Sequence, residues 1–116
     1  MSGGGKTFDA LSALAAEVLA AARAHGDLIA TAESCTGGLV SAALTSVPSS
    51  SDVFDRGFVT YTNTAKSEML GVPFWMIEKP GAVSEEVALS MAGGALTHSN
   101  AHLSVAVTGL AGPGGG

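Results

Sequence analysis

Apolar residues recur at three- and four-residue steps between residues 8 and 25, and this spacing predicts an amphipathic helix. Gly26 follows the segment and favours the end of the helix there, because glycine readily adopts the left-handed conformation common at helix ends. Residues 1–7 hold three consecutive glycines and are expected to form a flexible leader. The apolar face of the predicted helix consists of Phe8, Leu11, Leu14, Ala15, Val18, Leu19 and Ala22.

Shorter apolar runs alternate with helical patterns along the rest of the chain. Asn63 and Ser84 are expected to cap two of the later helices, since their side chains accept hydrogen bonds from unpaired N–H groups. Pro73 suits a first helical position, so a brief helical turn is expected at residues 73–78. The pattern predicts strands over residues 28–33, 54–62 and 102–108, and further helices over residues 37–46, 64–70 and 85–97.

Helices that alternate with strands indicate an α/β domain, expected over residues 8–116, of a three-layer type with a mixed, partly parallel sheet flanked by helices. The sequence stops inside a glycine-rich stretch after only three predicted strands, so the domain is expected to be C-terminally incomplete. In such sheets, functional groups gather at the carboxyl ends of the strands. Polar clusters at residues 33–36, 61–63 and 108–109 fall at these ends.

The composition narrows the class of protein. The chain has 116 residues, of which 47% are hydrophobic and 13% charged, so one domain that is apolar enough to fold is expected. A net charge of −5 argues against nucleic-acid binding, which requires a basic surface. The pattern includes neither a secretory signal nor a membrane span. The single cysteine permits no internal disulfide and no metal-ligand pair, which fits a reducing cytoplasm.

The junction between the first predicted strand and the next helix carries the strongest chemical signal. A hydroxyl on Ser34 and a thiol on Cys35 precede Gly37 and Gly38, where the helix is expected to begin. A helix start presents about four unpaired backbone N–H groups, which can hold a phosphate or a developing oxyanion beside a nucleophile. The alternative interpretation is an ordinary turn in which Ser34 or Thr36 only caps the helix.

A serine nucleophile needs a base, because its hydroxyl is protonated at neutral pH. The three histidines fall at predicted helix ends or at the wrong end of a strand, so none is well placed as that base. Lys66, one turn into the helix after the second strand, is a better candidate, provided that burial lowers its pKa. The alternatives are a solvated surface lysine and, for Tyr61, a half-buried strand residue with a wet hydroxyl.

Cys35 is the other possible nucleophile in this segment. Adjacent residues on a strand point to opposite faces, so Cys35 is expected to face the core if Ser34 faces a pocket. Free cysteine is also among the most buried residue types. We therefore expect a structural role for Cys35, and a cysteine hydrolase is the weaker hypothesis.

Five segments occur in a characteristic order and spacing: TAESCTGG at 31–38, RGFVTYTNTAK at 56–66, GV at 71–72, GAVSEE at 81–86 and VTGLAGPGG at 107–115. Together they closely resemble the CinA C-terminal domain family, whose enzymes are nicotinamide-nucleotide amidases. The resemblance extends from about Leu11 to Gly116, which is nearly the whole chain.

The resemblance implies a cytoplasmic amidohydrolase without metal or cofactor, which converts nicotinamide mononucleotide into nicotinate mononucleotide and ammonia in pyridine nucleotide recycling. Ser34 would be the nucleophile, Lys66 its proton acceptor, and Tyr61 a partner of this pair or of the pyridine ring. Family members tend to self-associate, so a homo-oligomer is expected. Residues expected around the substrate are Glu33, which would orient a neighbour, with Thr36, Gly37, Gly38, Asn63, Thr108 and Gly109.

The sequence departs from the family pattern at its C-terminal end. Family members continue past the glycine loop with further strands, a long final helix and an arginine suited to a phosphate group. The alternative hypothesis is therefore a catalytically inactive nucleotide-binding or protein-interaction module, associated with competence or DNA damage. Intact Ser34, Tyr61 and Lys66 favour the amidase, whereas the shorter C-terminal part favours the module.

Overall fold

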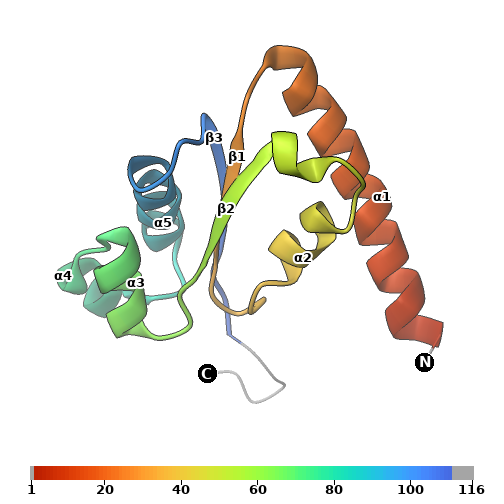
Figure 1. The fold of residues 1–116 in the computed structure, drawn as a ribbon. Helices are drawn as coiled ribbons and strands as arrows, with labels where there is room; N and C mark the ends of the chain where they lie inside the picture. The colour runs from red at the N-terminus through yellow and green to blue at the C-terminus, as the bar shows by residue number, and fades with distance from the viewer. Residues whose placement is uncertain (1, 111–116) are drawn as a thin grey trace.

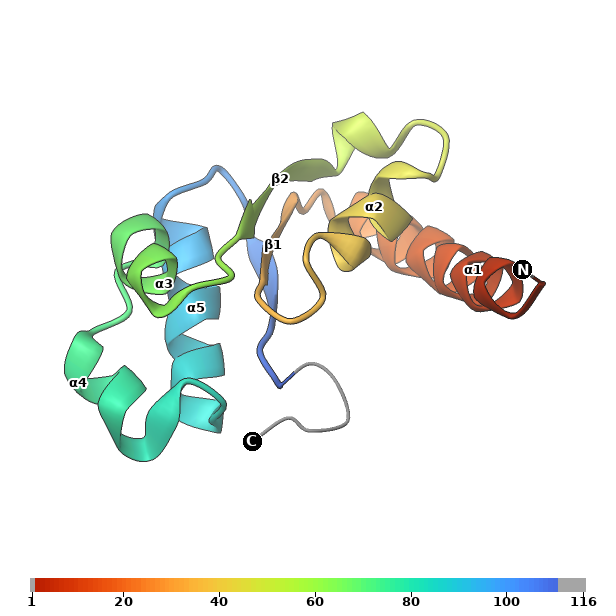
Figure 2. The ribbon, with the colours of Figure 1, turned by 90° about the horizontal axis from the view of Figure 1, so that it is seen from below.

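A computed structural model describes the backbone of residues 2–110 and the side chains of residues 7–110. A central sheet separates α1 and α2 on one side from α3, α4 and α5 on the other (Figure 1). The view from below shows the same three layers (Figure 2). The elements in chain order are α1 (Ser2–His25), β1 (Ile29–Glu33), α2 (Leu39–Thr45), the 3₁₀ helix η1 (Ser50–Asp52), β2 (Phe54–Val59), α3 (Asn63–Leu70), α4 (Phe74–Met76), the π-helix η2 (Ile77–Gly81), α5 (Glu85–Thr97) and β3 (Leu103–Val107).

The three described strands are parallel and lie in the order β2-β1-β3. The sheet was expected to be mixed, but both pairings among residues 2–110 are parallel, as helical crossovers between consecutive strands require. Glu33 at the end of β1 pairs with Val59 on β2 and with Val107 on β3, so the strands end at one level. The turns that follow them therefore meet at one edge of the sheet.

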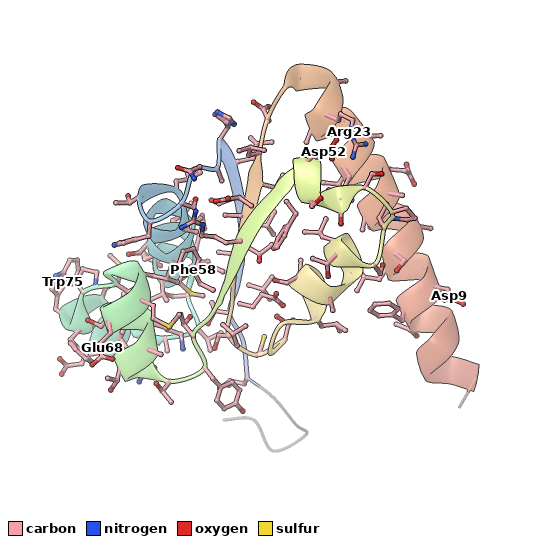
Figure 3. The ribbon with its side chains drawn as sticks, viewed as in Figure 1. Asp9, Arg23, Asp52, Phe58, Glu68 and Trp75 are labelled. Atoms are coloured by element: carbon pink, nitrogen blue, oxygen red, sulfur yellow. The ribbon has the colours of Figure 1, made fainter. Side chains whose placement is uncertain are left out.

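The strand β1 is buried along its whole length because helices cover both faces of the sheet. Its residues alternate between two aliphatic cores, and Phe58 of β2 points to the α3–α5 side (Figure 3). The core on that side contains Ala30, Ala32, Leu70, Val72, Ile77, Val87, Met91 and Ala95. The core on the α1–α2 side contains Ala15, Leu19, Ala22, Ile29, Ala43, Leu44 and Val53.

Two boundaries at the N-terminal side differ from the sequence predictions. Helix α1 begins at Ser2, so residues 2–7 lie in the helix and the expected flexible leader is wrong for them. Glycine costs a helix only about 1 kcal/mol, so an established helix can extend through several of them. Helix α2 begins at Leu39 instead of residue 37, because Gly37 and Gly38 have φ values of 60° and 107°, outside the helical region.

Two further boundaries differ around β2. The strand ends at Val59 instead of residue 62, because its partner β1 ends at Glu33 and offers no further pairing. Thr62 and not Asn63 caps α3, since the Thr62 hydroxyl accepts a hydrogen bond of 3.0 Å from the N–H of Ala65. The predicted cap of α5 is confirmed, with Ser84 Oγ accepting from the N–H of Val87 at 3.1 Å.

Candidate functional site

A cavity of about 230 Å³ lies where the turns after the three strands meet. Its walls combine hydroxyl, thiol, amide and amine groups from residues that are distant in the sequence. Because parallel strands end together, this position is where α/β sheets commonly bind ligands. The residues that line the cavity are Ser34, Cys35, Tyr61, Asn63, Lys66, Ala82, Val83, Thr108, Gly109 and Leu110.

Ser34 lies directly after β1, where the chain bends away from the sheet. Its N–H donates to the carbonyl of Val107 at 3.0 Å, which ties it to the end of β3. The residue is nearly buried, and its hydroxyl makes no hydrogen bond with any residue between 7 and 110. The hydroxyl is therefore available to a ligand in the cavity.

Lys66 occupies the first turn of α3 and is only 3% exposed. Its amine makes neither a hydrogen bond nor an ion pair within residues 7–110, although a buried charge normally has a partner. Burial lowers the pKa of Lys66, and the neighbouring Cys35 opposes this effect only in part. Burial thus favours the neutral amine that a lysine base requires, and this is the condition under which the sequence predicted Lys66 as the base.

The structure brings Ser34 and Lys66 to the same cavity, but no hydrogen bond joins the two side chains in this state. Catalytic hydrogen bonds are often long without ligand and shorten when substrate binds. The amine does not point into bulk solvent, which would have excluded it as a partner of the hydroxyl. Both side chains therefore line one cavity, and neither has a partner among the described residues.

The Glu33 side chain makes hydrogen bonds that the sequence did not predict. Its carboxylate is fully buried and accepts hydrogen bonds from the Thr36 hydroxyl at 2.7 Å, the Val40 N–H at 2.9 Å, and both the N–H and hydroxyl of Ser41 at 2.9 and 2.7 Å. Burial alone would raise the pKa of Glu33, but these hydrogen bonds together lower it. The carboxylate therefore occupies the start of α2 as an anion at neutral pH.

This arrangement changes the expected binding role of the segment from Glu33 to Gly38. Of the N–H groups at the start of α2, those of Val40 and Ser41 bind the Glu33 carboxylate. The N–H of Gly37 donates to the carbonyl of Ser34 at 3.1 Å. Glu33, Thr36, Gly37 and Gly38 all lie outside the residues that line the cavity. In the described structure, these four residues position Ser34 and α2 from outside the cavity wall.

Cys35 was expected to face the core, and the structure contradicts this. It lines the cavity together with Ser34 and is half-buried. Strand alternation does not apply here, because β1 ends at Glu33 and both residues lie in the bend and turn that follow. The sulfur packs against Gly109, where an added Cβ would lie 3.0 Å from Sγ.

The remaining predicted residues form the rim of the cavity. Tyr61 is 66% exposed in the loop after β2, and Asn63 begins α3 beside it. The Thr108 hydroxyl donates to the carbonyl of Ala82 at 2.9 Å, which ties the end of β3 to the segment before α5. Gly109 completes the wall next to the Cys35 sulfur. Tyr61 can thus cover a ligand only from the solvent side.

Three apolar wall residues were absent from the predicted site. They are Ala82, Val83 and Leu110. The first two belong to the GAVSEE segment, which contributed to the family resemblance but has no reactive group. The segment was the one sequence signal for these wall residues. Its place in the cavity wall could not be predicted, because it depends on how the chain runs between η2 and α5.

Cations and metal ligands are sparse around the cavity. Among residues 7–110, Lys66 is the one cationic side chain in the cavity wall. No group of three or more histidine, cysteine, aspartate or glutamate side chains gathers in the described part of the chain. His102, which was considered as a base, instead accepts the N–H of Leu28 at 2.9 Å, at the opposite end of the sheet. No helix within the described residues has the length and apolar character needed to cross a bilayer.

The fold and the cavity at the strand ends define an α/β protein with a serine and a buried lysine at one site. Residues 11–116 match the family model of the CinA C-terminal domain, so the chain belongs to this family. It is 51% identical over 106 residues to a nicotinamide-nucleotide amidohydrolase PncC of Enterobacter agglomerans, covering 91% of this chain and 65% of that protein. A CinA-like protein of Akkermansia muciniphila is 59% identical over 87 residues, which are 75% of this chain and 21% of that protein.

Solved structures of the superfamily have the same fold. The competence/damage inducible protein CihA of Agrobacterium tumefaciens is 54% identical with a TM-score of 0.87, and 91% of this chain matches 64% of that one. The competence damage-inducible protein ComA of Klebsiella pneumoniae is 40% identical with a TM-score of 0.88, with coverages of 91% and 66%. The chain thus spans less than two thirds of the first curated relatives, and about two thirds of these solved chains.

Proposed function

We propose that the chain is an amidohydrolase that deamidates nicotinamide mononucleotide, with Ser34 as the nucleophile and Lys66 as the base. The observation that carries the proposal is the buried, unpartnered amine of Lys66 in the same cavity as the free hydroxyl of Ser34. The relative named nicotinamide-nucleotide amidohydrolase supports the choice of reaction and substrate. The expected cytoplasmic location and homo-oligomer remain predictions.

The proposed reaction is acyl transfer in two steps. Ser34 Oγ attacks the carboxamide carbon while Lys66 takes the hydroxyl proton, and Lys66 then delivers that proton to the departing ammonia. Water subsequently attacks the acyl-serine, and its proton passes through Lys66 back to Ser34 Oγ as the carboxylate is released. The backbone N–H of Cys35 has no acceptor among the described residues, so it is our candidate donor to the oxyanion.

The described cavity offers few groups that could bind the phosphate of the nucleotide. Lys66 is the one cation in the described cavity wall, and the proposed chemistry requires it neutral. The start of α2 is already occupied by Glu33. Phosphate contacts would therefore come from residues outside 7–110 or from a second chain. This observation favours the second candidate, a nucleotide-binding or interaction module without turnover.

Ammonia release from nicotinamide mononucleotide distinguishes the two candidates. We expect turnover by the 116-residue chain, a loss of about a thousandfold in Ser34→Ala and in Lys66→Met, and retained activity in Cys35→Ala. Lys79→Met is the matched control, since Lys79 is exposed and lies outside the cavity. Activity that survives in Ser34→Ala contradicts the nucleophile assignment. Binding without ammonia release by the unmodified chain supports the module.

The pH profile of the same assay tests the base. Because burial lowers the pKa of Lys66, the rate should rise with pH and level off at a pH below 10.5, the ordinary lysine value. A rate that still rises at pH 10.5 would contradict the assignment, because it would show that the reaction does not depend on deprotonation of the Lys66 amine.

A further inference from the structure

The cavity holds a thiol beside the hydroxyl, and this thiol is the single cysteine of the chain. Cys35 is half-buried, and its sulfur is fixed where the turn after β1 meets the turn after β3. A methyl group on Gly109 would lie 3.0 Å from Sγ, so the sulfur already contacts the Gly109 backbone region. Exposed Tyr61 and Leu110 on the cavity rim show that the cavity reaches the surface.

A second group in the cavity points independently to reactivity at this position. Lys66 is 97% buried, has no hydrogen bond or ion pair within residues 7–110, and faces the cavity that Cys35 lines. The Lys66 amine and the Cys35 thiol thus belong to the wall of one cavity. An amine next to a thiol can take its proton and stabilise the thiolate, which is the reactive form of cysteine.

We propose that Cys35 is a reversible oxidation site, at which a small hydroperoxide oxidises the sulfur and a small thiol then caps it as a mixed disulfide. The proposal goes beyond the amidase proposal, because it concerns the sulfur and does not require turnover at Ser34. The class of ligand follows from the site, because a cavity of about 230 Å³ has room for a small oxidant and then for a small thiol.

The chemistry balances with the hydroperoxide and the thiol as co-reactants. The Cys35 proton passes to Lys66, the thiolate attacks one peroxide oxygen, and the O–O bond breaks. Sulfur loses two electrons and becomes a sulfenic acid, while the leaving oxygen takes the proton from Lys66. The incoming thiol then attacks the sulfenic sulfur, so that an S–S bond forms, the S–O bond breaks and water leaves.

The expected consequence is closure of the cavity. Ser34 and Cys35 line the same space, so a capped sulfur would occupy the volume in front of the Ser34 hydroxyl. Excess thiol would reverse the cap by disulfide exchange and reopen the cavity. Oxidation and reduction would thus close and open the site without any change in the fold.

The single cysteine makes the test direct, because every thiol signal reports on Cys35. The reduced chain is treated with hydrogen peroxide and dimedone, which traps sulfenic acids, and adduct formation is followed by intact mass. We expect one adduct, formed about tenfold more slowly in Lys66→Met, because methionine cannot take the thiol proton. Lys79→Met, an exposed lysine outside the cavity, should react like the unmodified chain. Circular dichroism checks that each variant is folded.

A second measurement does not depend on the folding of Lys66→Met. Ortho-phthalaldehyde joins one amine and one thiol into a fluorescent isoindole, with loss of two waters, when both groups are close together. We expect isoindole fluorescence in the unmodified chain, its loss in Cys35→Ser, and its retention in Lys79→Met.

Three results would overturn the proposal. The first is that hydrogen peroxide oxidises Cys35 at the same rate in the unmodified and Lys66→Met chains. The second is that the folded chain is oxidised no faster than the chain unfolded in urea. The third is that the unmodified chain forms no isoindole. These readouts are independent of ammonia release, so failure of the amidase proposal and failure of this one are distinguishable.

Discussion

Glu33 illustrates how one residue can support a site without lining its cavity. Its carboxylate receives four hydrogen bonds from the segment that follows Ser34, and so fixes the bend that aims Ser34 at the cavity. A charged residue at the end of a strand is easily interpreted as a binding group from sequence. Its full burial shows that the structural role dominates.

We expect Glu33→Gln to lower the free energy of unfolding by about 2 kcal/mol at pH 7, because hydrogen-bond donors are left facing an amide. The hydrogen bonds hold the Glu33 pKa below its usual 4.5, so their stabilisation is fully present above pH 4.5 and is lost as pH falls through the lower folded value. The difference in the free energy of unfolding between the unmodified chain and Glu33→Gln should therefore become smaller in acid. Urea unfolding at neutral and at acidic pH measures this difference.

The exposed residue Glu68 provides the control for this measurement (Figure 3). Glu68→Gln should leave the free energy of unfolding nearly unchanged at both pH values. An equal effect of the two substitutions would contradict the role assigned to Glu33.

Individual residues of the cavity could be predicted from the sequence where the chemistry of their side chains was sufficient to identify them. Ser34 and Lys66 were selected because a nucleophile needs a base, and the structure places both in one cavity. Cys35 was assigned to the wrong side, because alternation holds only while the backbone remains in a strand. The Glu33 network was not predictable, since it depends on how α2 folds back over the end of β1.

At the scale of elements, α3 and α5 pack closely against each other. Gly94 of α5 lies against the carbonyl of Leu70, so a side chain at position 94 would overlap the backbone of α3. Lys66 belongs to the same helix as Leu70. The approach of α5 therefore helps to set where the Lys66 amine lies.

Two adjacent glycines give a matched test of this packing. Gly93 is exposed with no atom within 4 Å of an added Cβ, so Gly93→Ala should stabilise the chain by about 0.5–1 kcal/mol through helix propensity. Gly94→Ala should destabilise it by about 2 kcal/mol or more through overpacking. Urea unfolding at neutral pH measures both, and the same sign for the two substitutions would contradict the close contact.

The sequence was informative about the type and order of the elements, because hydrophobic periodicity and turn residues are local signals. The ends of elements were less predictable. The start of α2 depends on the φ values of Gly37 and Gly38, and the end of β2 depends on where its neighbour ends. Parallel pairing also required knowledge of which strands lie side by side.

At the scale of the whole molecule, β3 forms one edge of the described sheet beside an apolar surface. Leu103 and Val105 of β3 and Leu14 and Val18 of α1 are each about half exposed. Beside them lies an apolar cavity of about 170 Å³, lined in part by Val105 and by residues of α1 and α2. An open edge next to apolar residues promotes pairing with another chain.

We expect the 116-residue chain to self-associate through this edge, because it offers both backbone pairing and apolar area to a second copy. Val105→Lys should lower the associated fraction, since lysine on an edge strand opposes strand pairing. Sedimentation velocity over a range of concentrations measures the change. Leu89→Lys is the control, because Leu89 is also apolar and is even more exposed (67% against 45% for Val105) but lies on α5. Equal association in the two variants would contradict pairing through β3.

The buried carboxylate at the beginning of α2 has a consequence for ion selectivity. Many α/β proteins bind sulfate or phosphate from solution at such a helix start. In this chain the negative charge there is the side-chain carboxylate of Glu33, at the end of the preceding strand. Oxyanions in the buffer consequently meet a negative charge at this helix start. Recognition of an anion then depends on the loops around the cavity, whose described wall carries one cationic side chain, that of Lys66.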